Sequence, residues 1–129
     1  MIKVEVFNKT KTAIDTTSLS KNISDFLKTK KVSKNSVVDV VVVGSDVMKS
    51  IAKIYLKEDP PSAHNVLSFV SSEIVGFVEI PDGLNRLGEI YICLPKAKEE
   101  ARREKVSLSE RIVFLAKHGV EHLLGNHHK

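Results

Sequence analysis

Four of the five histidines in this 129-residue chain lie within its last twelve residues. His118 and His122 are four residues apart in a stretch with helical patterning, so their imidazoles project from one helix face and can bind the same ion. Gly125 then allows the chain to turn back, and His128, or less easily His127, can complete a three-nitrogen face. The spacing H-x3-H-x5-H therefore predicts a metal site built from His118, His122 and His128.

Three histidine ligands leave one position of a tetrahedral zinc ion open. A water in that position has a pKa of about 7 and is a source of hydroxide at neutral pH. We therefore expect one Zn²⁺ per chain, with the zinc-bound water as one candidate nucleophile and no catalytic side chain identified. Zinc proteases of the H-E-x-x-H type carry a general-base glutamate where this chain has Gly119, so a peptidase is a minor alternative.

The histidines belong to the best-defined helix of the sequence. Ser107 and Glu110 have the spacing of a capping box, which predicts its first turn. Apolar residues recur at helical spacing from position 108 to position 124, and Gly125 is placed to end the helix in a left-handed conformation.

Upstream of this helix, alternating residues and short apolar runs predict a sheet of about four to five strands. Ser20 or Asn22 can cap the first helix, and Pro95 suits the first turn of the third. Helices interleaved with such strands indicate an α/β or α+β fold, with a mixed sheet, helices packed around it and the metal-binding histidines on the C-terminal helix. The expected strands are 2–8, 36–43, 66–70, 74–80 and 88–94, and the expected earlier helices are 20–30, 46–56 and 96–104.

Composition describes one globular domain covering residues 1–129. Hydrophobic residues make up 42% of the chain, and 20 Lys plus Arg against 16 Asp plus Glu give a net charge of +4, which favours a polyanionic partner. Aromatic residues make up only 5%, which argues against a stacked-aromatic RNA platform. One cysteine, no leader segment and no apolar run near the roughly 18 residues of a membrane span lead us to expect a cytoplasmic protein that does not enter a membrane.

Three segments, in order along the chain, resemble the YbeY family of endoribonucleases and ribosomal RNA maturation factors. Residues 118–128, HGVEHLLGNHH, resemble the family signature H-G-x-x-H-L-x-G-x-D-H. Residues 66–69, VLSF, resemble its D-V-L-S-F strand, and residues 87–95, LGEIYICLP, resemble its L-G-D-I-x-I-S-x-P segment. The resemblance covers most of the chain from about residue 36 onward.

The resemblance implies a mixed sheet with helices around it and a zinc ion held by His118, His122 and His128. It also implies hydrolysis of single-stranded RNA, in the maturation of the 16S small-subunit ribosomal RNA and in ribosome quality control. The sequence leaves two nucleophiles open for that reaction, the zinc-bound water and a ribose 2′-hydroxyl. The implied partners are the ribosomal RNA precursor and the small ribosomal subunit.

This chain differs from the family at three positions. The aspartate before the last histidine is His127 here, and the aspartate before V-L-S-F is Asn65. The arginine that follows the tyrosine matching Tyr55 is replaced by Leu56 and then Lys57, and we expect Lys57 to bind phosphate as a point charge. These differences favour an alternative function, that of a non-catalytic ribosome-assembly or RNA-binding factor with a structural metal site.

Overall fold

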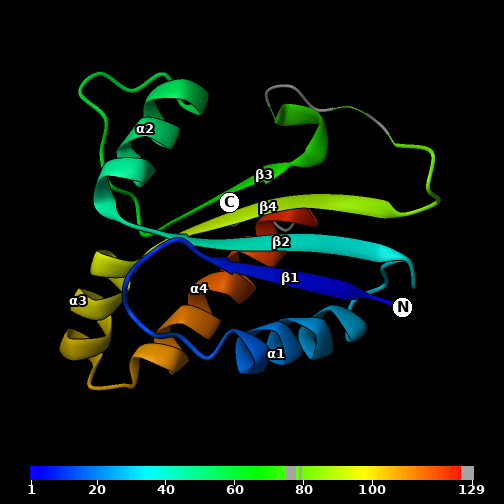
Figure 1. The fold of residues 1–129 in the computed structure, drawn as a ribbon, viewed down its shortest axis with the longest axis horizontal. Helices are drawn as coiled ribbons and strands as arrows, with labels where there is room; N and C mark the ends of the chain where they lie inside the picture. The colour runs from blue at the N-terminus through cyan, green and yellow to red at the C-terminus, as the bar shows by residue number, and fades with distance from the viewer. Residues whose placement is uncertain (75–77, 79, 126–129) are drawn as a thin grey trace.

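The computed structural model describes residues 1–74, 78 and 80–125. Within this part, four strands form a mixed sheet in the order β1-β2-β4-β3. β1, β2 and β4 are parallel, and β3 pairs antiparallel with β4 at one edge. The predicted fold class is confirmed. Figure 1 shows the elements: β1 (Lys3–Asn8), α1 (Thr16–Lys28), β2 (Ser36–Val43), α2 (Ser45–Tyr55), β3 (Val66–Val70), the short 3-10 turn η1 (Ser71–Glu73), β4 (Asn85–Cys93), α3 (Leu94–Glu104) and α4 (Leu108–Leu123).

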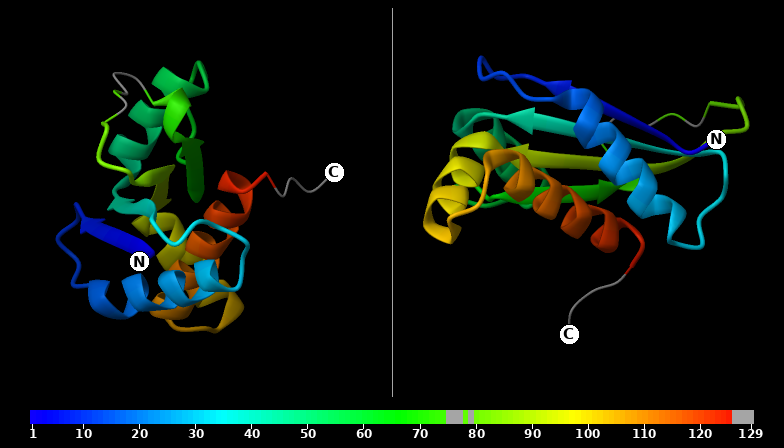
Figure 2. Two further views of the ribbon diagram at one scale, coloured as in Figure 1. Left: turned by 90° about the vertical axis from the view of Figure 1, so that its right-hand side faces the viewer. Right: turned by 90° about the horizontal axis from the view of Figure 1, so that it is seen from below.

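The sheet separates two helical layers of unequal size. α1, α3 and α4 cover one face and α2 covers the other, as Figures 1 and 2 show. Side chains of β2 pack against both helical layers, because successive side chains of a strand point to opposite faces of the sheet. Val38, Val40 and Val42 are fully buried in the core shared with α1 and α4, whereas Val43 packs with Met48 of α2. None of the described helices has the length and hydropathy needed to cross a bilayer.

α4, which carries His118 and His122, begins and ends as the sequence predicts. The Ser107 side chain accepts a hydrogen bond from the backbone N–H of Glu110 at 3.0 Å. Gly125 has a φ of +82°, a left-handed conformation that glycine adopts without strain. Its N–H donates to the carbonyl of His122 and closes the last turn.

α4 lies against β4 through two glycines. A Cβ at Gly119 would lie 2.6 Å from Cγ2 of Ile90, so only glycine allows the helix to approach this closely. A Cβ at Gly88 would collide with the backbone of Phe69 and would lie 2.9 Å from the side chain of Leu123. The position of α4 over the sheet therefore depends on the absence of side chains at both sites.

The first helix begins earlier than the sequence suggested, at Thr16. Its cap is Asp15, whose Oδ1 accepts a hydrogen bond from the backbone N–H of Ser18 at 3.0 Å. The predicted caps, Ser20 and Asn22, lie inside the helix. The prediction was wrong because the apolar period becomes visible only in the second turn, after two β-branched threonines that are poor helix formers.

The predicted strand 74–80 falls largely outside the described residues, since 75–77 and 79 are not described. The other three positions of that range are not in a strand. β4 in turn begins at Asn85, three residues before the predicted start at Gly88.

Three carboxylates lie in register on the sheet face that α2 covers. Glu5 of β1 pairs with Asp39 of β2, and Asp39 pairs with Glu89 of β4. Burial raises the pKa of Asp39 above its ordinary value, and the negative charges of Glu5 and Glu89 raise it further. The positive charges of Arg86 and Lys3 act in the opposite direction with smaller effects.

Asp39→Asn is expected to stabilise the protein at neutral pH. A raised pKa means that the folded state holds the Asp39 proton more strongly than the unfolded state, so stability falls as pH rises from the ordinary pKa through the folded one. Urea unfolding should therefore show a higher free energy of unfolding for the variant at about pH 7 and little difference near pH 3.

Asp25→Asn is the matched control for that experiment. Hydrogen bonding to Lys21 lowers the pKa of Asp25, so this change should give no stabilisation at neutral pH. Equal stabilisation by both variants would contradict the role assigned to Asp39.

Gly119→Ala is expected to lower the free energy of unfolding by up to about 2 kcal/mol. Overpacking against Ile90 costs about 1–3 kcal/mol, which exceeds the roughly 1 kcal/mol that alanine gains in helix propensity. Gly44→Ser serves as the control, because nothing lies within 4 Å of a Cβ there and serine is a favourable N-cap. A more stable Gly119→Ala protein in thermal or urea unfolding would show that α4 does not need this contact.

Candidate metal centre

The predicted histidine pair lies on the exposed side of α4. His118 and His122 are both exposed, while Gly119, Val120 and Leu123 turn toward the core. Four residues correspond to a rise of about 6 Å along the helix, which brings the two imidazoles to adjacent turns of one face. The structure therefore brings together two of the three predicted metal ligands.

A serine of β3 orients His122. Ser68 Oγ lies 2.7 Å from Nδ1 of His122, so a metal at this histidine would bind through Nε2. Ser68 lies between Val66 and Val70, which pack into the core beneath α4. A polar partner on the second nitrogen fixes the ring of a metal-binding histidine and is typical of metal sites.

Ser68 was missed as a functional residue in the sequence. It occurs there only as part of the VLSF segment, and its partner His122 is 54 residues away. A serine at a strand position that is otherwise apolar is the signal that was available, but only the pairing of α4 with β3 reveals its use.

The third predicted ligand, His128, lies outside the described residues, as does His127. Among the residues that the structure describes, no three His, Cys, Asp or Glu side chains are arranged to hold a metal ion. The pair His118 and His122, with Ser68 behind it, is a nitrogen donor set that suits zinc. The three-histidine site thus stays a prediction that the described geometry fits.

Lys57 lies at a different part of the fold from the histidines. It follows α2, is exposed and has a φ of +56°. α2 and α4 cover opposite faces of the sheet. One RNA strand could therefore contact both Lys57 and the histidines only by passing around an edge of the sheet. The phosphate-binding role of Lys57 stays a prediction.

Asn65 connects β3 to the helical layer. Its Nδ2 donates to Oε2 of Glu100 in α3 at 3.1 Å, and its Oδ1 accepts from the N–H of Val66 at 2.7 Å. Oε1 of Glu100 accepts a hydrogen bond from Nε of Arg111 in α4 at 2.8 Å. An aspartate at position 65 would place a second carboxylate against Glu100, whereas the amide donates to it.

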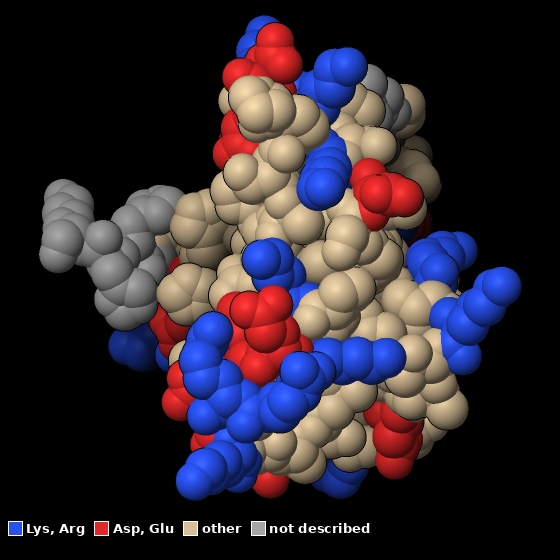
Figure 3. Space-filling view, turned by 90° about the vertical axis from the view of Figure 1, so that its left-hand side faces the viewer, with Lys and Arg blue, Asp and Glu red and all other residues tan. Residues whose placement is uncertain are grey.

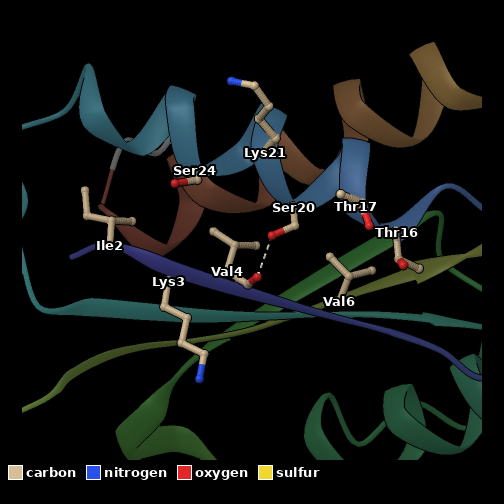
Figure 4. A pocket seen from close by; sticks show the side chains of 9 residues that line it. All are labelled: Ile2, Lys3, Val4, Val6, Thr16, Thr17, Ser20, Lys21 and Ser24. Atoms are coloured by element: carbon tan, nitrogen blue, oxygen red, sulfur yellow. Dashed lines mark hydrogen bonds between the residues drawn. The ribbon is translucent and has the colours of Figure 1, made fainter.

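A groove follows the outer edge of β1, away from the histidine pair. It has a volume of about 500 Å³ and lies between β1 and α1 (Figure 4). Ser20 Oγ donates to the carbonyl of Val4 at 2.7 Å and so satisfies one group of the strand edge. The described lining holds apolar side chains, hydroxyls and two lysines but no carboxylate, histidine or cysteine, so this groove offers no metal site.

Positive and negative side chains are mixed on the face of the molecule where α2 and α3 lie (Figure 3). Arg103 lies 3.8 Å from Glu99 within α3, and Arg111 lies 2.8 Å from Glu100. Because carboxylates accompany the cations, the charge on this face does not by itself identify a surface for a polyanion.

Comparisons with known proteins agree with the resemblance and with the fold. A family profile described as "Endoribonuclease YbeY" matches residues 5–129. A protein named "Endoribonuclease YbeY" from Aster yellows witches'-broom phytoplasma is 32% identical over 98 residues, which cover 76% of this chain and 64% of that protein. One of the same name from Dehalococcoides mccartyi is 34% identical over 128 residues, covering 92% and 73%.

A solved structure gives a similar result for the fold alone. The solution structure of a Thermotoga maritima protein superposes with a TM-score of 0.61 at 21% sequence identity, over 98% of this chain and 75% of that one. The arrangement of the sheet and helices is therefore shared with that protein.

Ser68→Ala is expected to weaken zinc binding about 10- to 100-fold, because the imidazole of His122 loses the group that orients it. Competition with a chromophoric chelator measures this affinity. Ser20→Ala makes the same chemical change on α1, beside β1, and should leave the affinity unchanged. Equal zinc affinity of wild type and Ser68→Ala would mean that the serine contact has no part in metal binding.

Proposed function

The chain belongs to the YbeY family, and from that premise we propose that it is a zinc-dependent endoribonuclease that cleaves single-stranded RNA in ribosomal RNA processing. The specific task would be maturation of the 16S ribosomal RNA and quality control of small subunits in the cytoplasm. The observation that carries the proposal is the exposed pair His118 and His122, with Nδ1 of His122 held by Ser68.

The residues of the site would divide the work between metal binding and orientation. His118, His122 and His128 would hold one zinc ion, which supplies Lewis-acid activation of a water or a phosphate oxygen when bound. Ser68 would keep the imidazole of His122 in one orientation, so that the site is preformed before RNA arrives.

Exposure of the histidines suits a polymeric substrate. Both side chains lie on the outer surface of α4, so an internal nucleotide of an RNA strand can approach them without an end of the strand entering a cavity. This is the geometry that an endonuclease needs. The net charge of +4 supports binding of the RNA backbone, with Lys57 as one candidate contact, and such binding should weaken as salt rises.

One observation favours the alternative function of a non-catalytic ribosome-assembly or RNA-binding factor. Asn65 replaces a family aspartate, and in this chain its side chain serves a structural contact between β3 and α3 through Glu100. In that case zinc would organise the C-terminal helix and RNA would bind without being cut. The two functions differ in whether the zinc-loaded protein cuts the RNA that it binds.

Single substitutions of the histidine pair test the proposal. His118→Ala and His122→Ala should each lose zinc, measured by elemental analysis of tag-free protein, and should reduce cleavage of a single-stranded RNA by at least about 100-fold, the lower range of a catalytic group's contribution. Both side chains are exposed, so circular dichroism and the unfolding midpoints of the metal-free proteins should differ little from those of metal-free wild type.

His64→Ala is the matched control. His64 lies in the loop after α2, where its Nε2 is 2.7 Å from Oε2 of Glu58, and it should retain both zinc and cleavage. Zinc-loaded wild-type protein that binds RNA but does not cut it would favour the binding-factor alternative. Wild-type protein that binds no zinc and still cuts RNA would contradict the metal mechanism.

A further inference from the structure

Phe114 is an exposed aromatic side chain on the helix that carries the histidines. It is 55% exposed and precedes His118 by four residues, so the two side chains lie on one face of α4 about 6 Å apart along the helix axis. A single exposed apolar residue needs no explanation in itself. The groups around Phe114 are what indicate a binding role for its ring.

A guanidinium group is held against the ring from one side. Cζ of Arg111 lies 4.5 Å from the centroid of the Phe114 ring. Nε and Nη2 of Arg111 each lie 2.8 Å from Oε1 of Glu100, whose other oxygen accepts from Asn65. The Arg111 and Glu100 side chains are only 18% and 12% exposed. Arg111 is therefore fixed, and the ring is pre-ordered for stacking, which lowers the entropy that binding costs.

A hollow of about 410 Å³ between α1 and α4 borders the same ring. Lys117, three residues after Phe114, lines this hollow. Arg111 is three residues before Phe114, so the two cations lie on different sides of the ring around the helix. From α1 the lining includes Ser18 and Asn22, whose Nδ2 donates to the carbonyl of Ser18 at 2.8 Å, and α4 adds the carboxylate of Glu110. A flat apolar ring beside a carboxamide and a hydroxyl offers a nucleobase both a stacking surface and partners for its edge.

A second ring, that of Phe26 in α1, contacts two ammonium groups beside this hollow. Nζ of Lys117 lies 5.3 Å from the ring centroid of Phe26, and Nζ of Lys30 lies 4.7 Å from the same centroid. Lys30 also lies 2.6 Å from Oε1 of Glu121, the residue before His122. Aromatic surfaces interleaved with cations are typical of sites that bind single-stranded nucleic acid.

We propose that the hollow between α1 and α4 is a nucleobase subsite for single-stranded RNA. One base stacks on Phe114, the phosphate beside it binds Lys117, and the strand continues along α4 to His118 and His122. This inference rests on the proposed function, because it states where the strand lies when its phosphate reaches the histidines. The low aromatic content argued against a stacking platform in the sequence, but one ring in the right place is sufficient for one base.

The test uses a fluorescein-labelled, six-nucleotide single-stranded RNA of mixed sequence, titrated with full-length protein and followed by fluorescence anisotropy. Gel electrophoresis after each titration verifies that the RNA is intact. Phe114→Ala should bind about 5- to 150-fold more weakly, the range expected for loss of one base–aromatic stack. Phe114→Trp, which keeps an aromatic surface, should bind like wild type.

Two further comparisons separate stacking from a general effect on the protein. Ile54→Ala removes an equally exposed apolar side chain, 59% exposed, from α2 on the other face of the sheet and should leave binding unchanged. Lys117→Gln should reduce the slope of log affinity against log salt by about 0.7, the value for one phosphate contact on a single strand. An abasic nucleotide scanned through the RNA should weaken wild-type binding at one position and leave Phe114→Ala binding unchanged there.

The outcomes distinguish this inference from the proposed function. If wild type cleaves RNA and Phe114→Ala binds as tightly as wild type, the subsite is wrong and the endoribonuclease stands. If Phe114→Ala loses affinity while wild type binds without cleaving, the subsite stands and the catalytic function is wrong. A wild-type protein that does not bind the RNA overturns the subsite.

Discussion

The contact between Gly119 and Ile90 is the constraint on which the functional site depends. Because residue 119 has no side chain, α4 lies close enough to β4 for His122 to contact Ser68 of the edge strand β3. A helix displaced outward would separate His122 from Ser68, because β3 is held to β4 by its own ladder and would not follow. The glycine between the two histidines is therefore a packing requirement that sets where the histidine pair lies over the sheet.

The two faces of the sheet have different roles. The face beneath α1 and α4 is apolar, with Val38, Val40 and Val42 fully buried, and it positions the helix that carries the histidines. The opposite face carries the carboxylates of Asp39, Glu5 and Glu89, where burial and the two neighbouring negative charges raise the pKa of Asp39. The helix that carries His118 and His122 therefore packs on the face with the larger apolar core.

A chain of polar contacts links the sheet edge to the outer surface of α4. Asn65 at the start of β3 donates to Glu100 of α3, and Glu100 holds Arg111, whose guanidinium lies against Phe114. This connection gives a physical reason for asparagine where the family has aspartate, since a second carboxylate would oppose Glu100. Asn65, where the chain departs from the family pattern, is therefore connected to the exposed ring of Phe114 through side-chain contacts of Glu100 and Arg111.

Local sequence patterns determined the position of α4 and the spacing of the histidines that it carries. The capping box at Ser107, the apolar stripe of α4 and Gly125 define a helix from short-range hydrogen bonds and periodicity, and the spacing of His118 and His122 follows from the helix alone. The start of α1 at Thr16 was missed because its first turn, after the cap Asp15, carries two threonines and none of the apolar periodicity that marks the rest of the helix. Pairings across the fold were decided only by tertiary structure: Ser68 with His122, Asn65 with Glu100 and Phe114 with the hollow beside α1. Contacts between residues far apart in sequence leave no periodic signal, since they arise from how the packed layers align.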